Sequence, residues 1–254
     1  RSRGLGDVSK SQDPSQMVEN WRQVFIPQPV KWNNYAEALQ YVNLIACFKN
    51  SLHVAALSIA GTLISCAFVA YSFARLRWPG RDAIFMIVIA TMMLPAQVTM
   101  VPVFLIYARI GWVNTLKPLW VGSFFGSAFF IFLLRQFFMT IPKERGEAAH
   151  IDGASHWTIY LRIMLPLSRP ALTAFGLIAF LGSWNSFIWP LIVINRPTMK
   201  TIPIGLQSLQ GFYGDANWSV LMAGAVMAAL PILVLFLLAQ KQFIEGITLT
   251  GLKA

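Results

Sequence analysis

Residues 50–74 read NSLHVAALSIAGTLISCAFVAYSFA, a run of 25 residues without Asp, Glu, Lys or Arg. A bilayer core about 30 Å thick is crossed by about 20 mostly apolar residues of α-helix. In hydrocarbon the backbone must satisfy its own hydrogen bonds, and a helix does so within one segment. We therefore predict that this stretch spans a membrane.

Four further stretches lack charged residues in the same way. They have lengths of 26, 17, 26 and 25 residues and cover 83–108, 118–134, 170–195 and 216–240. The short one continues through apolar residues to Thr140 if Arg135 snorkels toward the interface. Buried strands are only about 4–8 residues long, and membrane barrels alternate apolar and polar residues in segments of about 10. The pattern predicts an all-α integral membrane protein with five transmembrane helices in this chain.

The composition agrees with this class. The chain of 254 residues is 56% hydrophobic and 12% charged, whereas average proteins are about 45–50% apolar and about 25% charged. Intrinsic disorder requires low hydrophobicity and is excluded. Two cysteines, Cys47 and Cys66, are too few for a disulfide scaffold, and we interpret both as packing residues. The net charge of +10 would suggest nucleic acid in a soluble protein, but here the basic residues lie between spans.

Those basic residues predict the orientation. The loops after the first, third and fifth spans carry ten Lys and Arg, including Arg75, Arg77 and Arg81, against four after the second and fourth. The basic side faces the cytoplasm, so the C-terminus is expected there and residues 1–49 outside. Six basic residues in that external segment conflict with the rule, so we expect a sixth span that precedes Arg1 and is missing from this chain.

Two domains are expected from this topology. Residues 1–49 form an external N-terminal segment, in which apolar residues from Tyr35 to Ala46 recur at helical spacing and predict an amphipathic helix at the membrane surface. Residues 50–254 form the transmembrane domain.

The loop 141–169 between the third and fourth spans predicts two short helices. Pro142 suits a first helical turn with Thr140 as a cap, and Gly153 suits a left-handed helix end. Ser155 then caps a second helix, from about His156 to Met164, which Pro166 stops. By itself such a loop is equally a link between spans or a projection that fits a groove on another protein.

The same loop resembles a known family. The runs IPKERGEAAHIDGAS at 141–155 and IMLPLSRP at 163–170 are similar to the EAA loop of ABC importer permeases, although Arg145 and Gly146 depart from its usual pattern. The resemblance implies that this loop is the coupling helix that docks on a cytoplasmic ATPase dimer. The implied coupling residues are Glu147, Ala148, Ala149, Asp152, Gly153, Leu165 and Pro166.

Other segments resemble the carbohydrate branch of that family, which includes the maltose-type and glycerol-phosphate-type permease subunits. They are NSL at 50–52, AYSFAR at 70–75, MLP at 93–95 with Pro102, and WNSFIWPL at 184–191. The resemblance implies a second permease subunit, a periplasmic or lipid-anchored solute-binding protein, a carbohydrate substrate, and a bacterial or archaeal cell membrane.

Several other functions lack the residues they need. The chain has no GxxxxGK[ST] phosphate-binding loop, so we expect no cofactor on it and ATP on the partner ATPase. Ion-coupled transporters carry charged relay residues in their spans, and here only His53 lies in one. His150, Asp152 and His156 are the only candidate cluster, and six residues with a glycine break separate the histidines. We expect no metal site, no catalytic residue and no enzymatic activity.

Some residues within the spans suit a moving substrate route. Trp184, Asn185 and Trp189 lie within the fourth stretch, where the amide would line the route and an indole ring would stack on a sugar. An interhelical hydrogen bond from Asn185 is the alternative. Kinks are expected at Pro95, Pro102 and Pro231, and close helix packing at Gly122 and Gly126.

The combined expectation is a permease subunit of an ATP-driven importer for sugars or related polyols, surrounded by membrane lipid, with no nucleic acid partner. The alternatives are a non-transporting membrane scaffold or receptor subunit, and an ion-coupled secondary transporter. Which sugar or polyol is carried is not readable from the residues.

Overall fold

The chain folds around one long helix. The computed structural model describes residues 32–209 and 218–251, and the side chains within them except those of Tyr41 and residues 241–251. Helix α3 (Leu44–Arg75) has 32 residues, about 48 Å at 1.5 Å per residue, which exceeds the thickness of a bilayer core. The described residues form helices and connectors without a strand.

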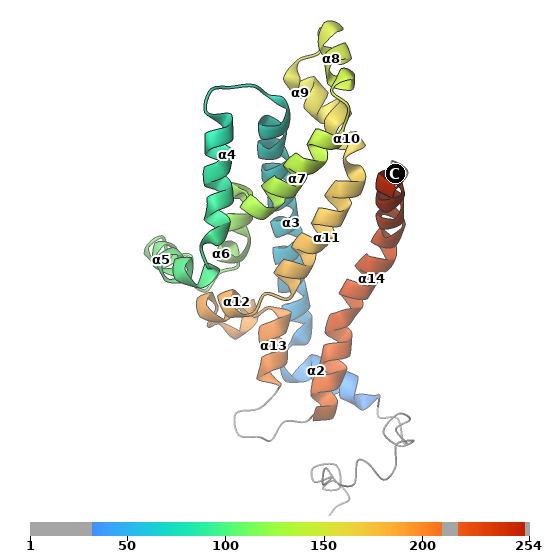
Figure 1. Cartoon of the computed structure of the whole chain (residues 1–254). Helices are drawn as coiled ribbons and strands as arrows, with labels where there is room; N and C mark the ends of the chain where they lie inside the picture. Colours follow the sequence, from blue (N-terminus) through green and yellow to red (C-terminus); the bar gives the residue numbers. More distant parts are fainter. Residues whose placement is uncertain (1–31, 210–217, 252–254) are drawn as a thin grey trace, which may run out of the picture.

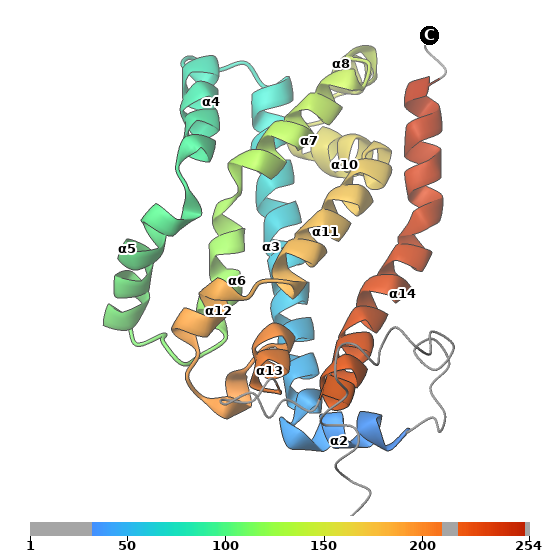
Figure 2. The same cartoon turned by 60° about the horizontal axis from the view of Figure 1, so that its bottom comes forward.

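Three helices pack around α3. These are α7 (Ala128–Thr140) and α11 (Arg169–Trp184), which lie against it, and α14 (Trp218–Gly251), which lies against α11 (Figures 1 and 2). Three segments are long and apolar enough to cross a membrane, and two bent helix pairs raise the number to five if each pair is one span. The predicted all-α membrane fold is confirmed, with three to five candidate spans.

The second predicted span is not a single helix. It consists of α4 (Arg81–Ala90) with a 3₁₀ turn (Thr91–Met93), followed by α5 (Ala96–Arg109), and the two arms meet at 97°. Leu94 and Pro95 are extended between them, because a proline disfavours helical geometry in the preceding residue. The expected kink at Pro95 is therefore a break, whereas Pro102 and Pro231 lie inside continuous helices.

The third span is also irregular. It contains α6 (Lys117–Trp120), a 3₁₀ segment η2 (Val121–Phe125) and α7, which ends at Thr140 as predicted. Gly126 has a φ of 84° and separates η2 from α7, so Gly122 and Gly126 do not form one helical face, and that prediction was wrong. The close approach is at Gly61 of α3, where a Cβ would lie 2.6 Å from the ring of Phe124.

The fourth span is shorter than its charge-free stretch. Helix α11 ends at Trp184, and α12 (Ile188–Val193) follows as a separate helix. Pro190 is the third residue of α12, where its missing N–H has no intrahelical partner to lose. Beyond it lie a 3₁₀ turn (Pro197–Met199) and α13 (Ile202–Ser208), which the sequence did not predict.

The N-terminal helix differs from its prediction. Helix α2 (Asn33–Tyr41) stops before Asn43, which has a φ of 47° and accepts a hydrogen bond from the N–H of Ala46 at 3.3 Å. Residues from Leu44 onward therefore belong to α3. Ala38 is fully buried and packs with residues of α14. The predicted external segment up to residue 31 lies outside the described residues.

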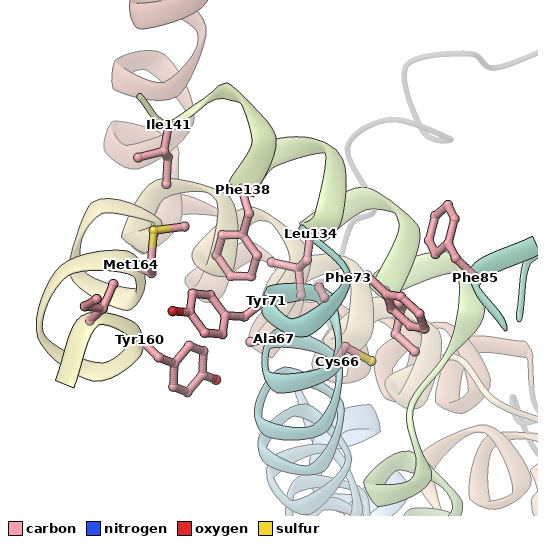
Figure 3. Close-up of a cluster of buried hydrophobic side chains, with 13 residues drawn as sticks. Cys66, Ala67, Tyr71, Phe73, Phe85, Leu134, Phe138, Ile141, Tyr160 and Met164 are labelled. Atoms are coloured by element: carbon pink, nitrogen blue, oxygen red, sulfur yellow. The ribbon is translucent and has the colours of Figure 1, made fainter. Parts of the chain in front are cut away.

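Two buried clusters hold the bundle at its opposite ends. One joins the C-terminal half of α3 to α7 and to the segment after α9 (His156–Ile159), and contains Cys66 (Figure 3). The other joins the N-terminal half of α3 to α11, α13 and α14, and contains Cys47. Both cysteines are free and buried, so their predicted packing role is confirmed.

Candidate functional site

A cavity of about 490 Å³ lies between the middle of α3 and the segments α6–α7, α11 and α12. Helix α3 contributes Ser51, Ser58 and Thr62 to its wall. These positions differ by seven and four residues, so they share one face of the helix. The face of α3 that borders the cavity is therefore hydroxyl-rich within an otherwise apolar span.

The rest of the wall is mixed, and most of its surface is apolar. It combines further hydroxyl groups with aromatic rings, from Ser123, Ser127, Ser183, Ser186, Thr201, Phe129, Phe130 and Trp189. Among the described residues that line the cavity, none is charged. Hydroxyl groups both donate and accept hydrogen bonds, and ring faces pack against C–H surfaces. The cavity therefore suits an uncharged, hydroxylated ligand, since it offers an ion no counter-charge to offset desolvation.

The first turns of α3 bind the segment 198–202, in which Thr201 lines the cavity. The Asn50 amide donates to the backbone oxygens of Thr198 and Lys200 at 2.9 and 3.0 Å. The Ser51 hydroxyl accepts a hydrogen bond from the N–H of Ile202 at 2.9 Å. Sequence reasoning assigned no role to Asn50, because its partners lie about 150 residues away along the chain.

The structure separates the three residues that were predicted for the substrate route. Trp189 lines the cavity, and its indole N–H donates to the oxygen of Pro118 at 3.1 Å. Trp184 is buried, and its indole N–H donates to the oxygen of Ala228 in α14 at 3.2 Å. Asn185 is exposed just beyond the end of α11, and neither it nor Trp184 borders the cavity.

The loop 141–169 projects from the end of the bundle that lies opposite α2 and α13 (Figure 1). Helix α8 (Glu144–Ile151) is followed by Gly153 with a φ of 82°, and Ser155 accepts a hydrogen bond from the N–H of Thr158 at 3.2 Å to cap α9. Both of these predicted caps are confirmed. Thr140 instead closes α7, and α8 begins after Pro142, so their predicted roles at its start were wrong.

The predicted coupling residues lie mostly on the surface of this projection. No residue of α8 is buried, and Glu147, Ala148, Asp152 and Gly153 are exposed. Ile151 is 87% exposed at the tip, whereas Ala149 packs toward the cluster beneath. The surface of the loop thus presents acidic and small side chains together with large apolar side chains, from Ile151, Trp157, Leu161 and Leu167.

The second helix of the loop continues past its predicted stop. After α9 the chain forms a π-helical turn (Tyr160–Met164) and α10 (Leu165–Leu167). Pro166 is exposed within α10 and does not end the helix, since the wide π turn precedes it. The bend of 76° comes at Ser168, whose buried hydroxyl donates to the oxygen of Met164 at 2.7 Å. Leu165 packs on the core.

The two histidines of the loop are closer than their spacing suggested. The rings of His150 and His156 stack with centroids 5.4 Å apart, although they lie on different helices. In the described part of the chain, no three His, Cys, Asp or Glu side chains gather as metal ligands would.

Comparison with known proteins points to one family. A family model described as a binding-protein-dependent transport system inner membrane component matches residues 29–245. An arabinooligosaccharide transport system permease protein of Halalkalibacterium halodurans is 34% identical over 91% of this chain and 82% of its own length. The corresponding protein of Bacillus subtilis is 36% identical over 81% and 73%.

A solved structure supports the fold. The chain is similar to one chain of a bacterial ABC transporter involved in the import of the acidic polysaccharide alginate, with a TM-score of 0.75 and 24% identity. The match covers 85% of this chain and 81% of the other.

Proposed function

The chain belongs to the family of binding-protein-dependent transport system inner membrane components, and from that membership we propose that it is the permease subunit of an ATP-driven importer for sugars or related polyols. The relatives named above are permeases for arabinooligosaccharides. Oligosaccharides of that kind are uncharged and rich in hydroxyl groups, which places them in the ligand class that suits the cavity.

The observation that carries this proposal is the uncharged, hydroxyl-lined cavity beside α3. A sugar that leaves water must exchange its hydrogen bonds for others, because each unpaired hydroxyl is costly in an apolar environment. Serine and threonine hydroxyls provide that exchange, and Trp189, Phe129 and Phe130 supply ring faces. Trp189 is the predicted pathway residue that borders this space, so the proposed substrate contacts include it and leave out Trp184 and Asn185.

Transport would be driven through the projecting loop. ATP binding and hydrolysis by a partner ATPase dimer would change its contacts with α8, around Glu147 and Asp152. Because α8 follows α7 and α9 leads into α11, a tilt of the loop shifts the helices that enclose the cavity. A ligand or nucleotide that favours one arrangement then shifts the population between inward-open and outward-open states.

The proposed topology places the loop in the cytoplasm. This is a multi-pass membrane protein of an inner-membrane family, and Arg75, Arg77, Lys143 and Arg145 lie at the end of the bundle that carries α8. The positive-inside rule assigns that end to the cytoplasm. The C-terminal end of α14 lies on the same side (Figure 2), which supports a cytoplasmic C-terminus.

The proposal includes partners and excludes an enzymatic role for this chain. The partners are the ATPase dimer, a second permease subunit and a solute-binding protein on the outer side, periplasmic or lipid-anchored. ATP would be bound by the ATPase, since this chain has no phosphate-binding loop.

Two measurements test the proposal. The tagged chain, purified from its native membrane, should carry an ATPase and a second permease in fixed stoichiometry. After reconstitution in liposomes with the binding protein, the complex should accumulate a labelled arabinooligosaccharide only when ATP is supplied on the α8 side. Purification without an ATPase would support a scaffold, and uptake driven by an ion gradient without ATP would support a secondary transporter. Either result overturns the proposal.

A further inference from the structure

The C-terminal ends of α3 and α7 are tied together by two arginines. One nitrogen of Arg75, Nη2, donates to the backbone oxygens of both Phe138, at 2.6 Å, and Ile141. In return, Nε of Arg135 on α7 donates to the oxygen of Phe73 at 3.4 Å. Each helix therefore receives a cation at its C-terminal carbonyl groups, which the helix dipole favours.

This exchange adds to the roles that the sequence suggests, which are a topology determinant for Arg75 and a residue that snorkels to the interface for Arg135. The Arg135 guanidinium lies 4.1 Å from the ring centroid of Phe85, within cation–π distance. Nε of Arg75 is buried without an acceptor among the described residues, so its bonds to α7 are made through Nη2.

A second residue on the same face of α3 reaches the start of α9, beyond α8 in the loop. The Tyr71 hydroxyl donates to the oxygen of His156, the first residue of α9, at 3.4 Å. Its ring packs against Tyr160, with centroids 5.1 Å apart, and edge-on against Phe138 (Figure 3). Tyr71 and Arg75 differ by four residues and so lie one above the other on the helix.

Together these contacts fasten both ends of the segment 141–156, which contains α8, to one helix. Arg75 binds the backbone where α7 leads into α8, and Tyr71 binds the backbone where α9 begins. The same helix carries Ser51, Ser58 and Thr62 into the cavity wall. An uninterrupted helix is stiff, so these bonds, together with the apolar cluster that joins α3 to α7 and to the segment after α9, pass a force on α8 along α3 to the cavity wall.

We propose that Arg75 and Tyr71 are positioning residues that make the loop, α3 and the cavity wall move as one rigid unit. This inference rests on the proposed transport function. It predicts that loss of a fastening lets the ATPase move α8 with less movement of α3, so that more ATP is hydrolysed for each sugar transported.

The test measures ATP hydrolysed per labelled arabinooligosaccharide transported by the reconstituted complex. Arg75→Met removes the donors while keeping an unbranched side chain, and Tyr71→Phe removes only the hydroxyl. Arg77→Met is the matched control, because Arg77 loses the same charge two residues away but is exposed. Arg75→Lys is the rescue variant, since one ammonium nitrogen has enough hydrogens for both carbonyl groups.

We expect Arg75→Met to raise the ratio about tenfold, the factor that matches one charge-assisted hydrogen bond, and Tyr71→Phe to raise it less. Arg77→Met should leave it unchanged, and Arg75→Lys should restore most of the coupling. Misfolding would instead lower hydrolysis and transport together, in proportion to the assembled complex. If both Arg75→Met and Tyr71→Phe hydrolyse as much ATP per transported arabinooligosaccharide as the wild type does, the proposal is overturned.

A second measurement separates this inference from the proposed function. Backbone amides of residues 141–156 should exchange hydrogen faster in Arg75→Met than in Arg77→Met, whatever the complex transports. If exchange is faster in Arg75→Met but the wild-type complex takes up no sugar, the inference about the fastening stands and the proposed transport function is overturned. Equal exchange in both variants would overturn the fastening itself.

Discussion

Replacement of Gly182 by leucine should block the cavity without harming the fold. Gly182 lies inside α11 and lines the cavity, and a Cβ built there meets no atom within 4 Å. Leucine is a better helix former than glycine by about 0.7 kcal/mol in a helix interior. The variant should therefore fold and insert at least as well as the wild type.

The size of the effect on transport follows from the volumes. A leucine side chain adds four carbon atoms, about 120 Å³ if each takes the volume of a water molecule, about 30 Å³. That is about a quarter of the cavity of about 490 Å³. A substrate that shares the space is overpacked at a cost of about 1–3 kcal/mol, which corresponds to about a 5–150-fold loss in transport rate at a given substrate concentration.

The assay is uptake of a labelled arabinooligosaccharide by reconstituted vesicles, together with the thermal stability of the purified complex. Gly182→Ala is the matched control, because it gains the helix propensity but adds only one carbon atom. We expect near-normal uptake with Gly182→Ala and a severe loss with Gly182→Leu at equal amounts of complex. Wild-type uptake by a stable Gly182→Leu complex would refute the assignment of this cavity to the substrate route.

Three further changes test other parts of the structure. Gly153→Pro should abolish uptake while the subunit still inserts, because Gly153 has a φ of 82° that proline does not adopt, and normal uptake in the assembled complex would contradict the coupling role. Asn50→Ala should lower the unfolding free energy by about 1–3 kcal/mol, since two bonds to the segment before α13 are lost; an unchanged denaturation midpoint would count against that anchor. Trp184→Phe should destabilise the complex by about 0.6–1.7 kcal/mol through the lost bond to α14 without altering which sugars are carried, and a changed substrate preference would place Trp184 on the route.

The ends of the loop helices could be predicted because their causes are local. Gly153 permits the left-handed residue that ends α8, and Ser155 supplies the cap three residues before its bonded N–H. The course of the loop beyond that point was not predictable. Pro166 is a helix breaker by its chemistry, but the chain forms a π-helical turn before it and bends two residues after it, at the buried Ser168.

The substrate route shows where reasoning from residue types fails. Trp184 and Trp189 have the same indole ring and lie five residues apart, yet one is buried against α14 and the other borders the cavity. The break after α11 turns α12 toward α6, and this turn decides which ring reaches the space. The serine and threonine face of α3 carried a usable signal, since 51, 58 and 62 share a helical face in a charge-free span.

The sequence by itself determined the membrane class, the five apolar stretches, the helix end at Gly153, the cap at Ser155 and the loop that contains them. These follow from solvent and from contacts within one helical turn, because hydrocarbon excludes charge and requires an internally bonded backbone. Only the tertiary structure decided the breaks within the spans, the cavity and the bonds of Arg75 and Asn50. Those bonds join residues 63 and 148 positions apart, and such partners are chosen by the packing of whole helices rather than by neighbouring residues.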